Sequence, residues 1–342
     1  MYIGKVGNEP VIISESSPNC SVLLTGISGS GKTCRMNQIE LEAALHGDTV
    51  IILDINQTHE DLQIFTPIYK TYQSLKNKIH VLKDGIEIPF LKPMVDSSGY
   101  YENYVNLVNN IITSLTGTIR FGIKQIGVLR TAVIFAINHL SYYSDAMSAI
   151  TDGLLQQGSK EAESVYEKLW SVLNCGVFRK SDKQIERGKI NILNFAGLDS
   201  ITKFVLAEII LSYLWRSSQH SGQAGQNKII IVLDEFQNLP LSQGTALRSM
   251  LCEGRKFNLS FLMATQSLDF FQKEVNAILN QAAVRLFFKP SHKDMRKIAG
   301  MIENSNIELW LECLQSLKIG ESIAIGNLKI GQHDVDYPII LK

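Results

Sequence analysis

The chain has 342 residues, of which 45% are apolar, and this is enough for one large core or for a core with an inserted lobe. Its 33 basic and 33 acidic residues leave no net charge, which excludes a basic field over the whole chain and restricts any contact with a polyanion to a local patch. The five cysteines form no Cys-x-x-Cys pair and no apolar run reaches the roughly 20 residues of a membrane span, so we expect a cytoplasmic protein without a disulfide framework, a zinc site or a membrane span.

The first predicted elements form a strand–helix–strand unit. Val22–Thr25 is a short apolar run that ends at glycines, which indicates a buried strand. Apolar residues then recur at helical spacing from Met36 and stop near Gly47, as in a helix. Thr49–Leu53 is a second apolar, β-rich run. This order of elements is typical of a parallel βαβ unit.

A phosphate-binding motif lies between that strand and that helix. Gly26–Thr33 matches the pattern G-x-x-x-x-G-K-[ST], in which glycines let backbone N–H groups face the phosphates of ATP. Lys32 places a charge beside the β- and γ-phosphates, and the Thr33 hydroxyl can ligate Mg²⁺. A chance glycine-rich turn is the alternative, but the flanking strand and helix argue against it. The predicted nucleotide-binding set is Gly26, Ser28, Gly29, Ser30, Gly31, Lys32, Thr33 and Cys34.

Several later apolar runs predict further strands of one sheet. Because these runs are continuous rather than alternating, and helical patterns separate most of them, we expect an α/β fold whose mostly parallel sheet is covered by helices on both faces. The predicted strands are Ile79–Leu82, Ile190–Phe195, Lys228–Leu233, Ser260–Ala264, Val284–Phe288, Ser322–Ile325 and Val335–Ile340.

The segment 100–188 has a different, helical character. Apolar residues share one helical face from Tyr104 to Leu115 and again from Ala162 to Val172, and residues 126–140 are a third helical candidate. We interpret this segment as a helical insertion. The predicted division is therefore 1–99 for the first part of the core, 100–188 for the insertion and 189–342 for the second part of the core.

Two carboxylates end the most apolar strand. Ile229–Leu233 is followed directly by Asp234 and Glu235. The carboxyl end of a parallel strand opens at the ligand crevice, so Asp234 could hold Mg²⁺ and Glu235 could act as general base toward the attacking water. An exposed acidic turn is the alternative, and the phosphate loop upstream argues against it.

Two further groups could contact the γ-phosphate. Gln266 follows the strand Ser260–Ala264 and could hydrogen-bond both water and phosphate, although a glutamine there is usually a loop residue. Arg255 precedes the same strand and could be either solvated surface or an arginine finger that reaches a neighbouring subunit. Arg285 and Arg248 are weaker candidates for that finger.

These motifs together resemble the HerA–FtsK superfamily of P-loop motors, and in particular HerA-type translocases and the conjugation ATPases of type IV secretion. Four elements match in order: the phosphate loop 26–33, the acidic strand ending in Asp-Glu-Phe at 234–236, the Gly-Arg-Lys turn at 254–256 and the Ala-Thr-Gln segment at 264–266. Ile51–Asp54 with Glu60 beyond it is a fifth, weaker match.

The resemblance implies a RecA-like P-loop core that hydrolyses ATP with Mg²⁺ in a homohexamer, with Lys32, Glu235, Gln266 and Arg255 as catalytic residues. It implies DNA as the substrate to be moved, and a nuclease or another effector as a possible partner. The alternatives are a conjugation or secretion ATPase and a nucleotide-gated scaffold. Two basic clusters could contact DNA or form solvated surface: Arg120, Lys124 and Arg130, and Arg179, Lys180, Lys183, Arg187 and Lys189.

Overall fold

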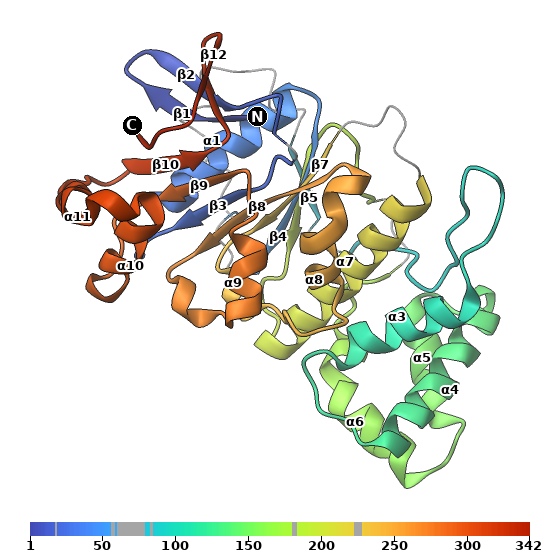
Figure 1. The fold of residues 1–342 in the computed structure, drawn as a ribbon. Helices are drawn as coiled ribbons and strands as arrows, with labels where there is room; N and C mark the ends of the chain where they lie inside the picture. The colour runs from blue at the N-terminus through green and yellow to red at the C-terminus, as the bar shows by residue number, and fades with distance from the viewer. Residues whose placement is uncertain (18, 56–58, 60–78, 83–84, 180–182, 222–227) are drawn as a thin grey trace.

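The computed structural model describes residues 1–17, 19–55, 59, 79–82, 85–179, 183–221 and 228–342. Within these ranges the centre of the molecule is a nine-stranded sheet with the strand order β13-β10-β9-β3-β8-β7-β4-β6-β5 (Figure 1). Its strands are β3 (Val22–Thr25), β4 (Thr49–Asp54), β5 (Ile79–Leu82), β6 (Ile190–Asn194), β7 (Ile229–Leu233), β8 (Leu259–Thr265), β9 (Val284–Phe287), β10 (Ser322–Gly326) and β13 (Ile339–Leu341).

Seven neighbouring strands, from β9 to β5, run parallel, and β10 and β13 extend the sheet in antiparallel register. The expected α/β fold with a mostly parallel sheet is therefore confirmed, and eight of the nine predicted strands agree with the structure to within one residue at either end. The prediction of one strand over Val335–Ile340 is wrong. β12 (His333–Val335) ends at the first residue of this segment and β13 begins at Ile339, because the chain passes from one sheet to another between them.

A second, four-stranded antiparallel sheet was not predicted. It has the order β1-β2-β11-β12 and joins the first residues of the chain, β1 (Tyr2–Val6) and β2 (Glu9–Ile13), to β11 (Leu328–Ile330) and β12 (His333–Val335). Figure 1 shows these blue and red strands side by side at the top of the molecule. The pairing of β2 with β11 thus brings the two ends of the chain together.

Alternate side chains of the central strands enter two different cores. Leu24, Ile52 and Val232 pack beneath the phosphate-loop helix α1 (Lys32–Leu45) and the small sheet. Leu23 and Leu233 face the other side, which is covered by α7 (Ser200–Ser221), α8 (Ala246–Glu253) and α9 (Lys273–Leu279). Helices therefore cover both faces, as expected, and the small sheet shares one of them with α1. Near β9 and β10, α10 (His292–Ile302) and α11 (Ile307–Ser316) form a third apolar cluster.

The segment predicted as an insertion contains four helices within the described residues: α3 (Tyr104–Thr116), α4 (Ile123–His139), α5 (Ala146–Leu155) and α6 (Lys160–Asn174). They cluster beside the sheet and not over its centre (Figure 1). Side-chain caps explain three of their starts, because Asn103, Asp145 and Ser159 accept hydrogen bonds from the first turns of α3, α5 and α6. Where the domains divide stays a prediction.

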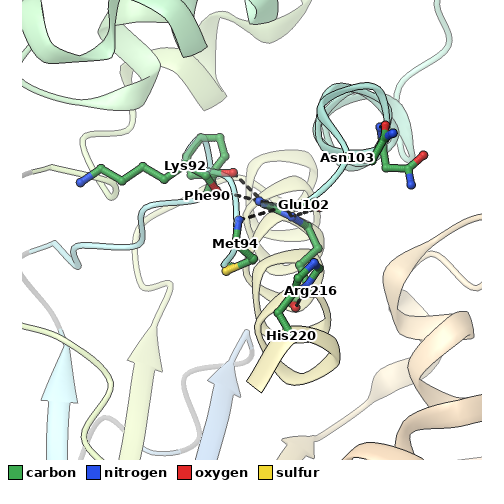
Figure 2. A network of polar contacts seen from close by, with 8 residues as sticks. Phe90, Lys92, Met94, Glu102, Asn103, Arg216 and His220 are labelled. Carbon is green, nitrogen blue, oxygen red and sulfur yellow. Dashed lines mark hydrogen bonds and ion pairs between the residues drawn. The ribbon is translucent and has the colours of Figure 1, made fainter. Parts of the chain in front are cut away.

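A buried ion pair anchors the approach to this helical cluster on the core. Arg216 of α7 pairs with Glu102, which lies just before α3, and the closest N–O distance is 2.7 Å. The same guanidinium donates to the carbonyl oxygens of Phe90 and Lys92, each at 2.8 Å, and Glu102 accepts from the backbone N of Met94 (Figure 2). The guanidinium and the carboxylate thus each have several partners among the described residues, so α3 begins at a defined place relative to α7.

None of the helices in the described ranges combines the length and the apolar content that crossing a bilayer requires.

Candidate nucleotide site

The phosphate loop joins the carboxyl end of β3 to the start of α1. Gly31 has a φ of 104°, and a Cβ added there would lie 2.7 Å from the Cα of Gly320, so glycine is required twice over. The backbone N of Gly320 donates to the carbonyl of Ser30 at 3.0 Å, which holds the C-terminal part of the chain against the loop. The first N–H groups of a helix have no partner within it, so this end of α1 can receive an anion.

Lys32 folds back onto the loop. Its Nζ donates to the carbonyl oxygens of Gly26 at 2.7 Å and Ile27 at 3.1 Å. Burial lowers the pKa of this amine, while the carboxylates of Glu235 and Asp234 act in the opposite direction. The ammonium group thus lies between the loop and the acidic strand end, which is where a phosphate would meet it.

Thr33 and Asp234 are far apart in sequence and face each other in the fold. The Thr33 hydroxyl lies 3.4 Å from Oδ2 of Asp234. Burial and the neighbouring Glu235 raise the pKa of Asp234, and the positive charges of Lys32 and His59 oppose this shift. A hydroxyl and a carboxylate at this separation, beside a phosphate loop, are a donor set that fits Mg²⁺, an ion that keeps several waters and takes the rest of its ligands from phosphate.

Glu235 has a backbone conformation that few residues adopt. Its φ of 54° and ψ of 44° are left-handed, which costs of order 1–3 kcal/mol for a residue other than glycine and is typical of functional sites. The turn directs its carboxylate toward β8, where Oε1 accepts from Nε2 of Gln266 at 3.1 Å, and the second oxygen contacts the amide of Gln237. The structure therefore brings Glu235 and Gln266 together, although 31 positions separate them.

These side chains line one open cavity of about 690 Å³ at the carboxyl edge of the sheet. Its lining is polar apart from one aromatic ring and consists of Ser28, Thr33, Asp234, Glu235, Gln237, Asn238, Gln266 and Phe270. Gln237, Asn238 and Phe270 were not predicted, since a glutamine, an asparagine or a phenylalanine in a turn carries no distinct signal in sequence.

Cys34, the last residue of the predicted set, faces the other side of the loop. It is exposed and lines a second hollow of about 350 Å³ together with Gly31, Gln38 and Gly320. The start of α1 therefore separates two cavities, one beside the acidic strand end and one beside Cys34.

Arg255 lies at the opposite end of the sheet. It is exposed in a 3₁₀ turn, Gly254–Phe257, that precedes β8, whereas Gln266 and the phosphate loop lie beyond the carboxyl ends of β8 and of its parallel neighbour β3. The seven residues of β8 span about 20 Å at about 3.3 Å per residue. Arg255 therefore does not reach the cavity of its own chain.

The two weaker arginine candidates have partners within their own chain. Arg248, on α8, donates to the carbonyl of Leu241 at 3.4 Å. Arg285, on β9, donates to Oδ1 of Asn280 at 3.2 Å. Of the three arginines, Arg255 is the exposed one.

A buried carboxyl group supports the helix that leads to Arg255. Glu208 of α7 accepts from the backbone N of Ala246, the first residue of α8. Burial raises the pKa of Glu208 from 4.5 to about 7, and the hydrogen bonds from the start of α8 oppose the shift. The pKa of Glu208 is higher in the folded state than in the unfolded state, so the folded chain binds this proton more tightly. Protonation of Glu208 therefore stabilises the folded state fully below pH 4.5, and this stabilisation is lost as the pH rises through about 7.

We expect Glu208→Gln to remove this pH dependence. The free energy of unfolding of the native chain should fall, relative to that of the variant, by up to about 3 kcal/mol between pH 4.5 and pH 8. Denaturant titrations at several pH values measure the difference, and Glu167→Gln, at an exposed position on α6, is the control. Parallel pH profiles for the native chain and Glu208→Gln would contradict this account.

A buried histidine connects α1 to the end of β4. His59 is 2% exposed, with Nδ1 3.3 Å from Asp54 and Nε2 3.6 Å from Glu40 of α1. Hydrogen bonds and the charges of both carboxylates raise its pKa to about 10 against the opposing effect of burial. The histidine is therefore charged within an ion network. The sequence assigned no such role to any histidine, and Glu60 of the weaker motif lies outside the described residues.

The two basic clusters are partly neutralised where the structure describes them. Nζ of Lys124 lies 3.9 Å from Glu161, and Nζ of Lys189 lies 2.5 Å from Glu186. Lys180 lies outside the described residues. Acidic neighbours favour the solvated-surface interpretation for these two lysines.

A glycine loop between β3 and α1, a buried lysine and an acidic pair at the end of the parallel strand β7, one strand beyond β8, together define a P-loop nucleotide-binding fold. Comparisons with family models and with curated proteins gave no match. Solved structures do match. VirB4 of Thermoanaerobacter pseudethanolicus is similar with a TM-score of 0.71 and 16% identity, over 100% of this chain and 95% of that chain.

The plasmid coupling protein TrwB is similar in two nucleotide complexes. The complex with the ATP analogue ADPNP has a TM-score of 0.67 and 14% identity, over 95% of this chain and 85% of that chain. The complex with ADP and Mg²⁺ has a TM-score of 0.62 and 12% identity, over 100% of this chain and 93% of that chain. The chain therefore has the fold of VirB4 and TrwB, and the expected RecA-like core is confirmed.

Proposed function

We propose that this chain is an ATP-hydrolysing motor that acts on DNA as a homohexamer, with each ATP bound between two copies. The observation that carries the proposal is the convergence of Thr33, Asp234, Glu235 and Gln266 on one open cavity beside the phosphate loop. The TrwB complexes with ADPNP and with ADP and Mg²⁺ support a nucleotide as the ligand of this fold.

Each group has a chemical task in this proposal. The loop N–H groups and Lys32 bind the phosphates, and the nucleoside extends toward the hollow beside Cys34. Thr33 and Asp234 would hold Mg²⁺, which neutralises charge on the phosphate oxygens when bound.

Glu235 takes a proton from a water whose oxygen attacks the γ-phosphorus. The bond to the bridging oxygen breaks, and ADP and phosphate are the products. Gln266, which donates a hydrogen bond to Glu235, positions that water.

The need for an arginine at the γ-phosphate supports the placement of the site between copies. Among the described residues that line the cavity there are two carboxylates and no arginine, whereas phosphoryl transfer gains most from an arginine at the γ-phosphate. Arg255 is exposed at the opposite edge of the sheet, where a neighbouring copy could present it. A heterologous contact of this kind generates a ring when the rotation between copies closes, as the proposed homohexamer requires.

Stimulation of ATPase activity by DNA tests the proposed function. We expect duplex or single-stranded DNA to raise turnover several-fold, and Lys32→Ala to lower it by about 10²-fold or more with and without DNA. Arg130→Ala, in one of the basic clusters, should weaken DNA binding while basal turnover stays unchanged if that cluster contacts DNA. Turnover that no DNA affects would count against the DNA motor.

Similarity to a plasmid coupling protein favours a second candidate, a conjugation or secretion ATPase that drives transfer of DNA or protein. DNA-independent turnover that a membrane-bound channel stimulates would support this candidate. Tight ATP binding without turnover would instead support the nucleotide-gated scaffold, with a nuclease or another effector as its partner.

A further inference from the structure

An aromatic side chain projects from the rim of the nucleotide cavity. Phe270 is 62% exposed and lines that cavity. It ends a 3₁₀ turn, Leu268–Phe270, whose next residue, Phe271, stacks on Phe236 with ring centroids 4.7 Å apart. Nδ2 of Asn276 donates to the carbonyls of Leu268 at 3.1 Å and Phe271 at 3.0 Å. These contacts fix the backbone of the turn on both sides of Phe270, and the turn carries the exposed ring at the rim of the cavity.

A hollow of suitable size for such a ring lies beside Arg255, at the opposite end of β8. Its volume is about 200 Å³. Its apolar walls include Met250, Leu259, Phe261 and Leu279, and its polar lining includes Asn19, Ser21, Gln281 and Arg255. A dry cavity of about 150 Å³ with apolar walls accepts a benzene molecule, so the hollow is large enough for a phenyl ring.

The ring and the hollow lie at opposite ends of α9. Phe270 precedes the start of this helix, and Leu279 at its end lines the hollow. Head-to-tail contact between copies therefore presents one feature to the other. Their neighbours are complementary in charge, since Asp234 and Glu235 lie in the cavity that Phe270 borders and Arg255 lies at the hollow.

We propose that Phe270 of one copy inserts into the hollow beside Arg255 of the next copy, so that the aromatic contact and the arginine contact form together. The inference rests on the proposed function, because it takes the ATP site to lie between copies. In addition, the inserted ring of Phe270 holds Arg255 of the next copy at a fixed position relative to the ATP. It also connects the γ-phosphate to the interface, because Gln266 and Phe270 lie on one short segment after β8.

A native thiol makes the contact testable. Cys252 is exposed and lines the hollow. In Phe270→Cys, a short bis-maleimide should join the new thiol to Cys252 of the next copy and produce a ladder of covalent oligomers on a denaturing gel. The ladder should disappear in Phe270→Cys/Cys252→Ser and should be absent from the native chain. A pattern that the Cys252→Ser change leaves unaltered would overturn the proposed contact.

Assembly gives a second measurement. Phe270→Ala should raise the protein concentration required for half-maximal ATPase activity by about tenfold or more, as loss of an aromatic anchor does. Tyr142→Ala, at a position that is 81% exposed on the helical cluster, should leave it unchanged. Mixing subunits that lack Arg255 with subunits that lack Lys32 separates the two proposals. If this mixture regains activity but Phe270→Cys gives no Cys252-dependent ladder, the site between copies is supported and the aromatic contact is wrong. If mixing also fails, the proposed function fails with it.

Discussion

Glu235→Gln should abolish ATP hydrolysis while ATP binding is retained. The amide oxygen of glutamine can still accept the hydrogen bond that Gln266 donates at 3.1 Å, so the left-handed turn and the cavity keep their shape. An amide takes up no proton near neutral pH, so the attacking water loses its base. Turnover should fall by about 10²- to 10⁴-fold, the usual contribution of a general base.

Two measurements separate this effect from a loss of folding. Equilibrium titration with a fluorescent ATP analogue should give an affinity at least equal to that of the native chain, because a negative charge beside the γ-phosphate has been removed. Glu312→Gln, an exposed position on α11, is the matched control and should leave both turnover and affinity unchanged. Native turnover in Glu235→Gln would exclude it as the base.

Arg255→Ala should lower turnover by about 10³-fold or more, as loss of an arginine finger does, while each copy still binds ATP. The physical reason is the distance within one chain. Arg255 precedes β8 and the phosphate loop lies beyond the other end of its parallel neighbour, so the guanidinium can act only on the ATP of another copy. Activity should therefore depend on the composition of a mixed oligomer.

Mixing variants tests this directly. In an equimolar mixture of Arg255→Ala and Lys32→Ala subunits, random assembly should restore about a quarter of the sites, each with Lys32 from one copy and Arg255 from the next. Lys32→Ala mixed with Glu235→Gln should restore none, because both residues serve the same cavity from the same chain. Recovery in the second mixture, or none in the first, would refute the assignment of Arg255 to the neighbouring site.

Short-range features of this protein followed directly from its residues. Eight consecutive residues suffice for the phosphate loop, and the runs Val22–Thr25 and Ile79–Leu82 match their strands to the residue. All four residues of Val22–Thr25 are buried and three of them are apolar, as expected for a strand that is covered on both faces. Asp234 and Glu235 were predicted because the carboxyl end of a parallel strand opens at the ligand crevice and a phosphate loop lies upstream. The carboxyl-edge cluster then followed from the rule that parallel strands end together.

Other features depend on contacts between distant parts of the chain, which no local pattern contains. The pairing of β2 with β11 joins segments at the two ends of the sequence and adds a second sheet. Phe270 and the hollow beside Arg255 became visible only when exposure and cavity shape were known. The same holds for His59, whose charge comes from Glu40 and Asp54 packed around it.

By itself, then, the sequence determined the chemistry of the site, because phosphate binding and acid–base catalysis need particular residue types at particular places on a strand–loop–helix unit. Only the tertiary structure decided which of those residues meet within one chain and which lie apart from them. That decision rests on the direction of β8, which carries Gln266 to the phosphate edge of the sheet and leaves Arg255 at the opposite edge.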